Sequence, residues 1–510
     1  MTSHIPSTET ALIEFMDTVD TRMEALSRRM GLAHFNQLTG QSYEDMPAIN
    51  DAIGRIMRNP ENLEIIEHWF SRVTDPSLKR RLEIFRRSFR SARITEDPDL
   101  FRKTHELQGK IIGFSPEIDG RSISRTERNR ILESEPDREM RRTAYYAGKI
   151  LDDQIEDDVL SLMELRNMLA RQHGYDDYID FGLQNQELRE SELMELFEQI
   201  RILTDEGWRD LLEDARQELN VRTLMPWDLN YYIESVMTLP PPALFPKDRI
   251  IPVFKSVLKD CGGDLDSLPI DVIIQDIPYG GLCMTIDFTR DIRILSNPRN
   301  GFMSYDTLFH EFGHGIHASG LDNASYLVAA GDPPFFWEGI AGLYEHLMQT
   351  DHVLKTYFDL DDDAIDQIAR RSRYFRMSWF RNIAVVCQVE WAAYRGERNL
   401  RALMRELHTR YLGYELPDDV GWAGNTLYTT HPLYNQNYMM MDVMALQTIE
   451  AVRKRFGAYP CPEMFEAVNR SYIQPSGWIP WRDKICEFTG EALSADALGR
   501  YLASSSRSEY

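Results

Sequence analysis

Three histidines and a glutamate lie within eight positions of this sequence. Residues 308–320 read LFHEFGHGIHASG, although the whole chain has only 12 histidines among 510 residues. Imidazole nitrogens and carboxylate oxygens are the usual nitrogen and oxygen ligands of protein-bound Zn²⁺. The spacing of these residues therefore indicates a candidate metal site.

The surrounding residues predict one helix for this stretch, since Ser304 suits an N-cap and Gly320 a C′ position. On a helix, His310 and His314 project from one face, because they are four residues apart. Two imidazoles at this spacing can bind a single tetrahedral Zn²⁺. Glu311, rotated by about 100° around the helix, can then take a proton from a water on the metal without being a ligand.

A catalytic zinc site also needs a third protein ligand and one open position. The longer pattern that ends in a third histidine fails here, because Gly320 stands where that histidine would be. His317 lies on the same helix face as the two ligands, but one straight helix cannot easily give three ligands to one ion. We expect His317 to line the site or to support a ligand, with ordinary packing as the alternative.

A glutamate on the next predicted helix can supply the third ligand. Residues 331–349 read GDPPFFWEGIAGLYEHLMQ, and Asp332 followed by Pro333 predicts a helix start. Glu338 stands among apolar residues, where a carboxylate is costly to bury without a partner, so zinc ligation would account for it. Glu345, two turns further on the same face, could accept the N–H of a ligand histidine. The alternative for both glutamates is an ordinary solvated helix residue.

Most of the remaining chain predicts helices. Residues 10–225 are rich in helix formers, with apolar residues at spacings of three and four. The convincing strand region is 270–295, which is enriched in β-branched and aromatic residues. The Pro-rich segment 238–246, TLPPPALFP, is the best candidate for a boundary or loop.

Charge and cysteine usage exclude several classes of protein. The formal net charge of −24 argues against nucleic acid and anionic membranes as partners. The five cysteines are scattered and odd in number, which favours a reducing compartment over a disulfide framework. Neither a secretory signal nor a membrane span is visible, so we expect a cytoplasmic protein. The sequence does not indicate an oligomeric state.

The metal motifs resemble those of a known family. LFHEFGHGIH followed by FWEGIAGLYEHL is similar to the M3-type zinc oligopeptidases, which include thimet oligopeptidase, neurolysin and the oligoendopeptidase F group. The segments at 224–232 and 431–447 resemble further blocks of that family. The resemblance is strong over about 220–450 and general over the first 200 residues. The Gly-rich substrate loop of the thimet-like members is not recognisable, so cleavage specificity is not carried over.

The resemblance implies a mainly α, neurolysin-like fold in which two helical lobes flank a deep channel. Residues 1–225 would form an N-terminal lobe that walls the channel, and residues 226–510 a catalytic lobe with zinc at the channel floor. A small sheet near the zinc would offer an edge strand to the substrate backbone. Only short, unstructured peptides could enter such a channel.

A tyrosine-bearing segment completes the expected site. A helix is predicted from Pro432 to about Arg455, which would place His431, Tyr434 and Tyr438 on one face. In the family, a tyrosine matching Tyr438 stabilises the oxyanion that peptide hydrolysis creates, and Tyr434 and His431 are further candidates. The alternatives are a buried aromatic stripe for the tyrosines and a helix cap or surface position for His431.

The sequence therefore predicts an HExxH zinc metallopeptidase with one Zn²⁺ per chain and short peptides as substrates. Three alternatives stay open. The first is a dipeptidyl carboxypeptidase or carboxypeptidase, for which the Arg-rich segment 370–381 offers cations that could bind a terminal carboxylate. The second is a zinc hydrolase that trims one precursor peptide, and the third is a peptide-binding relative without turnover.

Overall fold

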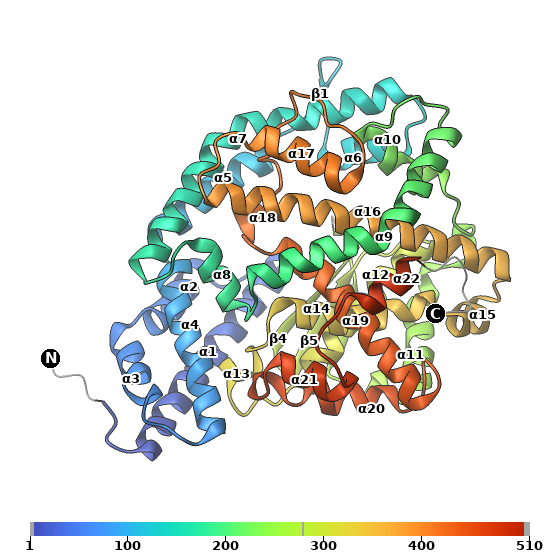
Figure 1. Cartoon of the computed structure of the whole chain (residues 1–510). Coiled ribbons are helices and arrows are strands. Elements are labelled where there is room, and N and C mark those ends of the chain that lie inside the picture. Colours follow the sequence, from blue (N-terminus) through green and yellow to red (C-terminus); the bar gives the residue numbers. More distant parts are fainter. Residues whose placement is uncertain (1–4, 278–279, 504–510) are drawn as a thin grey trace. The chain divides into compact units, whose positions relative to one another are not determined.

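The computed structural model of the chain describes residues 5–277 and 280–503, most of which are helical (Figure 1). The chain divides into two compact units, each assembled from three separate stretches. Unit 1 comprises Met1–Glu96, Pro241–Asp361 and Met440–Ser494, and unit 2 comprises Asp97–Pro240, Asp362–Met439 and Ala495–Tyr510.

These units differ from the predicted division at residue 225, because the chain passes between them several times. One passage falls at Pro240 and Pro241, inside the Pro-rich segment 238–246 that the sequence marks as a boundary. Local composition could indicate that break, whereas the passage between Met439 and Met440 falls inside a helix.

Unit 1 contains a three-stranded sheet. β3 (Ile270–Ile274) pairs in parallel with β5 (Asp291–Ser296), and β4 (Gly281–Asp287) pairs antiparallel with the other side of β5. Alternate residues of β5, such as Ile292 and Ile294, are buried, as the period of a strand requires. β4 is thus an edge strand of this sheet, and the strand region predicted at 270–295 is confirmed.

Helices cover the sheet and form the rest of unit 1. Phe35 of α1 shares an apolar cluster with Ile286 and Leu295 of the sheet, and a second cluster joins α1 to α4 around Met16 and Phe85. The helices of unit 1 are α1 (Glu9–Leu38), α2 (Met46–Met57), α3 (Pro60–Phe70), α4 (Pro76–Thr95), α11 (Ile250–Asp260), α12 (Phe302–Gly320), α13 (Tyr326–Ala329), α14 (Pro334–Glu345), α15 (Asp351–Phe358), most of α19 (Asn435–Phe456), α20 (Met464–Val468) and α21 (Trp481–Thr489).

Unit 2 consists of helices and one two-residue hairpin, β1 (Glu117–Ile118) with β2 (Arg121–Ser122), which the sequence did not indicate. Its helices are α5 (Pro98–Gly113), α6 (Arg125–Ser134), α7 (Arg138–Gln172), α8 (Tyr178–Asn185), α9 (Glu190–Glu218), α10 (Pro226–Tyr231), α16 (Asp362–Tyr394), α17 (Leu400–Leu412), α18 (Leu427–Thr430), the first turn of α19 and α22 (Asp496–Ala503). The mainly helical fold with small sheets is thus confirmed.

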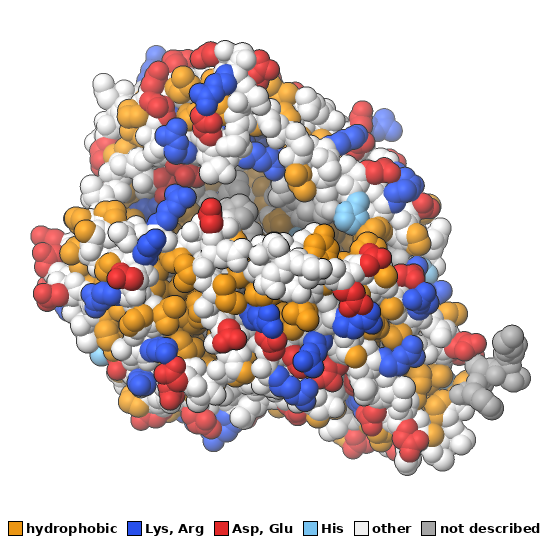
Figure 2. Space-filling view, turned by 180° about the vertical axis from the view of Figure 1, so that it is seen from behind, with side chains coloured by type: hydrophobic (Ala, Val, Ile, Leu, Met, Phe, Trp, Pro, Cys, Tyr) orange, Lys and Arg blue, Asp and Glu red, His pale blue; other side chains and the backbone are white. Residues whose placement is uncertain are grey.

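On the face shown in Figure 2, acidic and basic side chains are interspersed among apolar ones. None of the helices within residues 5–277 and 280–503 is long and apolar enough to cross a membrane.

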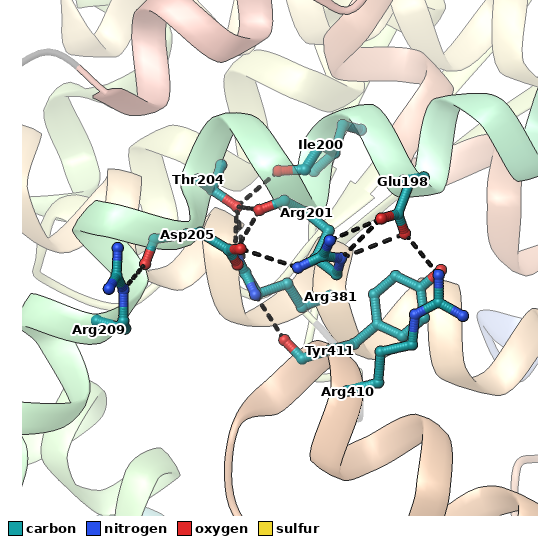
Figure 3. A network of polar contacts seen from close by, with 9 residues as sticks. All are labelled: Glu198, Ile200, Arg201, Thr204, Asp205, Arg209, Arg381, Arg410 and Tyr411. Carbon is teal, nitrogen blue, oxygen red and sulfur yellow. Dashed lines mark hydrogen bonds and ion pairs between the residues drawn. The ribbon is translucent and has the colours of Figure 1, made fainter.

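A buried arginine joins three helices of unit 2 (Figure 3). The Arg381 guanidinium on α16 donates to the carbonyl oxygen of Tyr411, at the end of α17, over 2.7 Å. It also donates to Thr204 Oγ1 and to the Arg201 carbonyl on α9, and it pairs with Asp205 over 2.8 Å. Arg381 therefore supplies a donor to the Tyr411 carbonyl in the last turn of α17, where a helix leaves its carbonyls unsatisfied, and it ties this turn to α9.

Replacing Arg381 with Met should lower the free energy of unfolding by about 3 kcal/mol, because the buried carbonyls and Asp205 lose charged hydrogen-bond donors. The midpoint of chemical unfolding, followed by circular dichroism, measures this loss. Arg209→Met is the matched control, since Arg209 donates only to the exposed end of the same network, at the Asp205 carbonyl. A loss no larger than that of the control would contradict the structural role of Arg381.

Candidate metal centre

His310 and His314 lie one turn apart on α12, and Glu338 of α14 faces both of them. The Nε2 atoms of the two histidines lie 3.3 and 3.5 Å from the same Oε2 atom of Glu338. One ligand atom from each of the three side chains lies within 4.8 Å of the others. Two imidazoles and one carboxylate that converge in this way fit a catalytic zinc ion with one open position.

The convergence depends on how closely α12 and α14 pack. A side-chain carbon at Gly313, on α12, would lie only 2.5 Å from the Cα atom of Ala341 on α14. No residue with a Cβ atom could occupy this position without pushing the helices apart. Glycine at 313 thus brings Glu338, one turn before Ala341, within reach of the two histidines.

α14 begins one residue later than the sequence predicted. Pro333 is its N-cap and Pro334 its first residue, whereas Asp332 had been expected to cap it. The Asp332 carboxylate instead accepts a hydrogen bond from Lys484 Nζ over 2.6 Å, and both side chains are fully buried. The start of α12 also differs from the prediction, in the opposite direction. Its N-cap is Gly301 and not Ser304, so this helix begins earlier than expected.

Glu345, the last residue of α14, contacts the first candidate ligand. Its Oε2 atom lies 2.9 Å from His310 Nδ1, the ring nitrogen on the side away from Glu338. A carboxylate in this position accepts the Nδ1–H of a neutral imidazole and leaves Nε2 free to bind a metal. The predicted contact between Glu345 and a ligand histidine is therefore present.

The two carboxylates change the protonation of the site. Burial disfavours the charged form of His310, but hydrogen bonds with Glu338 and Glu345 outweigh burial and raise the pKa of His310 well above its usual value. Burial also disfavours the charged form of Glu338, but hydrogen bonds with His310 and His314 outweigh it and lower the pKa of Glu338. The cluster therefore attracts positive charge, and a metal cation would displace protons when it binds.

Glu311 lies beside the ligands without joining them. Its Oε2 atom accepts a hydrogen bond from the Cys283 backbone N–H on β4 over 2.7 Å. The strand can approach this closely because Gly281 has no side chain, and a Cβ atom there would lie 2.8 Å from Glu311 Cγ. The half-buried carboxylate is thus oriented by an edge strand, a contact that the spacing of the sequence motif does not reveal.

His317 is part of the packing below the site. It is buried, and its Nε2 atom has no hydrogen-bond partner among the described residues. Burial lowers the pKa of His317 to about 3, so its imidazole is neutral near pH 7. Its ring lies 6.2 Å from that of Trp337, the neighbour of Glu338 in the chain. This placement fits the alternative of ordinary packing better than a contact with a ligand.

The helix predicted from Pro432 to about Arg455 is present as α19, but it begins three residues later, at Asn435. α18 ends at Thr430, and His431 is its C-cap. Leu433 adopts a left-handed backbone with φ of 57°, which interrupts the helix. Of the three predicted residues, only Tyr438 is therefore helical.

The three residues of this segment lie close to one another within unit 2. The rings of Tyr434 and Tyr438 are 5.4 Å apart, and Tyr438 lies at the same distance from Trp379. His431 is exposed and its ring lies 5.8 Å from Tyr434. The metal cluster belongs to unit 1, so a common site for the tyrosines and the metal stays a prediction.

A second buried pair, absent from the sequence-based prediction, fixes the far end of α14. His346 follows the helix directly, and its Nε2 atom lies 2.7 Å from Asp442 Oδ1 on α19. Both side chains are almost fully buried. His346 and Asp442 are 96 positions apart in the sequence, so no local pattern could have indicated their contact.

Removing the Glu345 carboxylate should weaken zinc binding, because His310 would lose the group that orients its ring. We expect Glu345→Ala to raise the zinc dissociation constant about 10–100-fold, as for other residues that support metal ligands. Titration against a fluorescent chelator measures this change. Glu345→Gln should lose less zinc affinity, because its amide oxygen can still accept the N–H of His310. Equal zinc affinities for wild type and Glu345→Ala would contradict the proposal that Glu345 orients His310.

Comparisons with known proteins bear on the class of this chain. Residues 131–245 match the model of peptidase family M3. This stretch lies almost entirely in unit 2, includes the motif at 224–232 and ends before the metal-binding helix. The match thus extends the resemblance into a region where the motifs alone gave only a general likeness. No curated protein sequence matches the chain.

The fold is similar to that of solved structures, among them an M32 carboxypeptidase from Deinococcus radiodurans R1. The two chains are 14% identical, with a TM-score of 0.66, and the match covers 96% of this chain and 97% of that chain. At this identity the similarity concerns the fold alone. The family match and the shared helical fold together confirm the resemblance to the M3-type metallopeptidases that the metal motifs indicated.

Proposed function

We propose that the chain is a zinc metallopeptidase that hydrolyses peptide bonds of short, unstructured oligopeptides. The observation that carries this proposal is the convergence of His310, His314 and Glu338, with the carboxylate of Glu311 beside them. A zinc ion held there would polarise the scissile carbonyl and make the attacking water more acidic. The match to peptidase family M3 supports peptides as the substrate class.

Glu311 is proposed as the general base and acid. Its carboxylate would take a proton from the attacking water and pass it to the nitrogen of the leaving amine. The hydrogen bond from the Cys283 N–H holds one carboxylate oxygen and leaves the other for this transfer. Because β4 is an edge strand, an extended peptide that pairs along it would pass beside Glu311.

The oxyanion formed during the reaction would be stabilised by a hydrogen-bond donor. We assign this role to the phenol of Tyr438, with Tyr434 and His431 as further donors. The resemblance to the M3 family supports the assignment, and the rings of Tyr434 and Tyr438 lie 5.4 Å apart.

A carboxypeptidase or dipeptidyl carboxypeptidase is the second candidate. The Deinococcus protein with the similar fold is described as a carboxypeptidase. Such an activity needs a cation that binds the terminal carboxylate of the substrate. Most arginines of the segment 370–381 already have partners in unit 2, namely Arg370, Arg371, Arg376 and Arg381. Arg373 has no hydrogen bond or ion pair among the described residues, which makes it the candidate cation.

Digestion of a mixed peptide library by the zinc-loaded enzyme, with mass-spectrometric mapping of the products, tests the proposal. Cuts at internal bonds support the oligopeptidase. Uniform loss of single residues or dipeptides from the C-terminus supports the second candidate, and Arg373→Ala should then abolish the preference for a free terminal carboxylate. Cleavage of one precursor peptide alone would indicate a trimming enzyme, and stoichiometric zinc without any cleavage would refute the peptidase.

Replacing Glu311 with Gln should leave zinc stoichiometry unchanged and lower kcat about 10²–10⁴-fold, because the shape of the side chain is kept and only the proton transfer is lost. Metal analysis after dialysis and hydrolysis of a fluorogenic peptide measure the two effects. Loss of the metal in this variant would mean that Glu311 is a ligand.

Replacing Tyr438 with Phe should lower kcat about 10²–10³-fold and leave KM almost unchanged, because the oxyanion exists only near the transition state. Tyr434→Phe is the matched control, with a smaller expected effect. Zinc content and thermal stability should stay the same in both, since the ring is kept. If Tyr438→Phe keeps its full kcat while Tyr434→Phe loses most of it, the main donor to the oxyanion is Tyr434 and not Tyr438.

A further inference from the structure

Two buried charged side chains of unit 2 hold the segment that leads to the tyrosines. Arg166 of α7 donates to the carbonyl oxygens of Tyr428 and Thr429, at the end of α18, over 2.6 and 2.7 Å. Glu390 of α16 accepts a hydrogen bond from the Leu433 N–H over 2.9 Å. The short loop between α18 and α19 is therefore bound by its backbone at both ends.

The second of these contacts sits at the one strained residue of the loop. Leu433 has φ of 57°, a conformation that costs free energy for a residue with a side chain. Its side chain is fully buried against Gly182 of α8, where a Cβ atom would lie 2.4 Å from Leu433 Cδ1. Gln186 Nε2 donates to the Leu433 carbonyl over 2.9 Å. The left-handed turn persists because these contacts outweigh its cost.

Glu390 is an unusual anchor, because it is fully buried and its Oε2 atom has no hydrogen-bond partner among the described residues. The groups that face it are Arg166 on α7, Tyr178 on α8, Cys387 and Tyr394 on α16, and Tyr428 on α18. Only one of them, the guanidinium, carries a charge near pH 7. Burial raises the pKa of Glu390 to about 7, although the Leu433 N–H and Arg166 oppose this effect.

We propose that Glu390 and Arg166 are positioning residues for the tyrosine-bearing segment. Glu390 fixes Leu433 and Arg166 fixes the end of α18, and together these contacts set where the helix α19 starts and hence where the side chains of Tyr434 and Tyr438 lie. The inference rests on the proposed function, in which Tyr438 donates a hydrogen bond to the oxyanion. Neither positioning residue needs to touch the substrate.

The contacts of Arg166 and Glu390 with Tyr428, Thr429 and Leu433, which we call the clamp, have a predictable pH dependence. The pKa of Glu390 is raised in the folded chain from the ordinary value of 4.5, so protonation of this side chain favours the folded, clamped state. The stabilisation is fully present below the ordinary pKa and is lost as the pH rises through about 7. The segment should therefore be held more firmly at pH 6 than at pH 8, by the linkage between proton binding and folding.

Amide hydrogen exchange of residues 428–438, followed by mass spectrometry, tests the clamp without reference to activity. Glu390→Leu removes the acceptor and should speed this exchange about ten-fold or more at pH 6. Glu390→Gln keeps an oxygen acceptor without a charge, so it should match wild type at pH 6 and be better protected than wild type at pH 8. Leu211→Ala, a buried change on α9 of the same unit, controls for a general loss of stability.

Steady-state kinetics then test whether the clamp serves the tyrosine. Glu390→Leu should lower kcat about ten-fold or more with little change in KM, and it should add almost nothing to Tyr438→Phe, because both changes remove the same donor. Arg166→Met should act in the same direction. Glu390→Gln should retain kcat, which a general loss of packing would not explain.

The two experiments separate the inference from the function on which it rests. Unchanged exchange of residues 428–438 in Glu390→Leu, or exchange no faster than in Leu211→Ala, would overturn the clamp. Faster exchange with wild-type kcat would uphold the clamp and overturn the part of the proposed function that involves the tyrosines. Full additivity of Glu390→Leu with Tyr438→Phe would overturn the link between Glu390 and that hydroxyl.

Discussion

The candidate metal centre depends on the near contact of two helix backbones. α12 carries the two histidines and α14 carries the glutamate, and neither helix could be a metal site alone. Glycine at 313 lets α14 approach until Ala341 lies where a side chain would otherwise be. Protein interiors are too densely packed to absorb even one added methyl group without a shift of the surrounding atoms. Three ligand atoms can bind one zinc ion only if all of them lie at bonding distance from it, so even a small displacement of α14 from α12 would disrupt the site.

Both ends of α14 are fixed by buried polar pairs, and the two pairs add to the effect of the helix contact. Asp332 with Lys484 lies just before its first turn, and His346 with Asp442 lies just after its last. Buried pairs of this kind contribute little net stability, since desolvation offsets their attraction. Their partners can be satisfied in only one arrangement, however, so they restrict how the helix can slide or rotate. The register of Glu338 and Glu345 against the histidines is a consequence of this restriction.

Spacing within one helix and the cost of burying a carboxylate were sufficient to predict the metal cluster. His310 and His314 share a face in any regular helix, and Glu338 stands in so apolar a stretch that it required a partner. The helix that carries Tyr438 was predicted, but its start was placed three residues too early, because the Leu433 N–H bonds to Glu390, which comes 43 positions earlier. The Asp332 cap failed for the same reason, since its partner Lys484 lies 152 positions later. Local patterns cannot report contacts of this range, and they also could not indicate that each unit is built from three stretches.

The interleaving of the two units also constrains the order in which the chain can fold during its synthesis. Unit 1 lacks most of α19, α20 and α21 until residues 440–494 have been made, and unit 2 lacks α22, whose Gly499 packs against Leu203 of α9, until a few residues later. Domains made of one continuous stretch can fold in turn as they leave the ribosome, at about 5–20 residues per second. Here neither unit can close early, so the histidine helix and its apolar surroundings must wait in partly folded chains. Such chains expose apolar surface and are prone to aggregate until the last segments have been made.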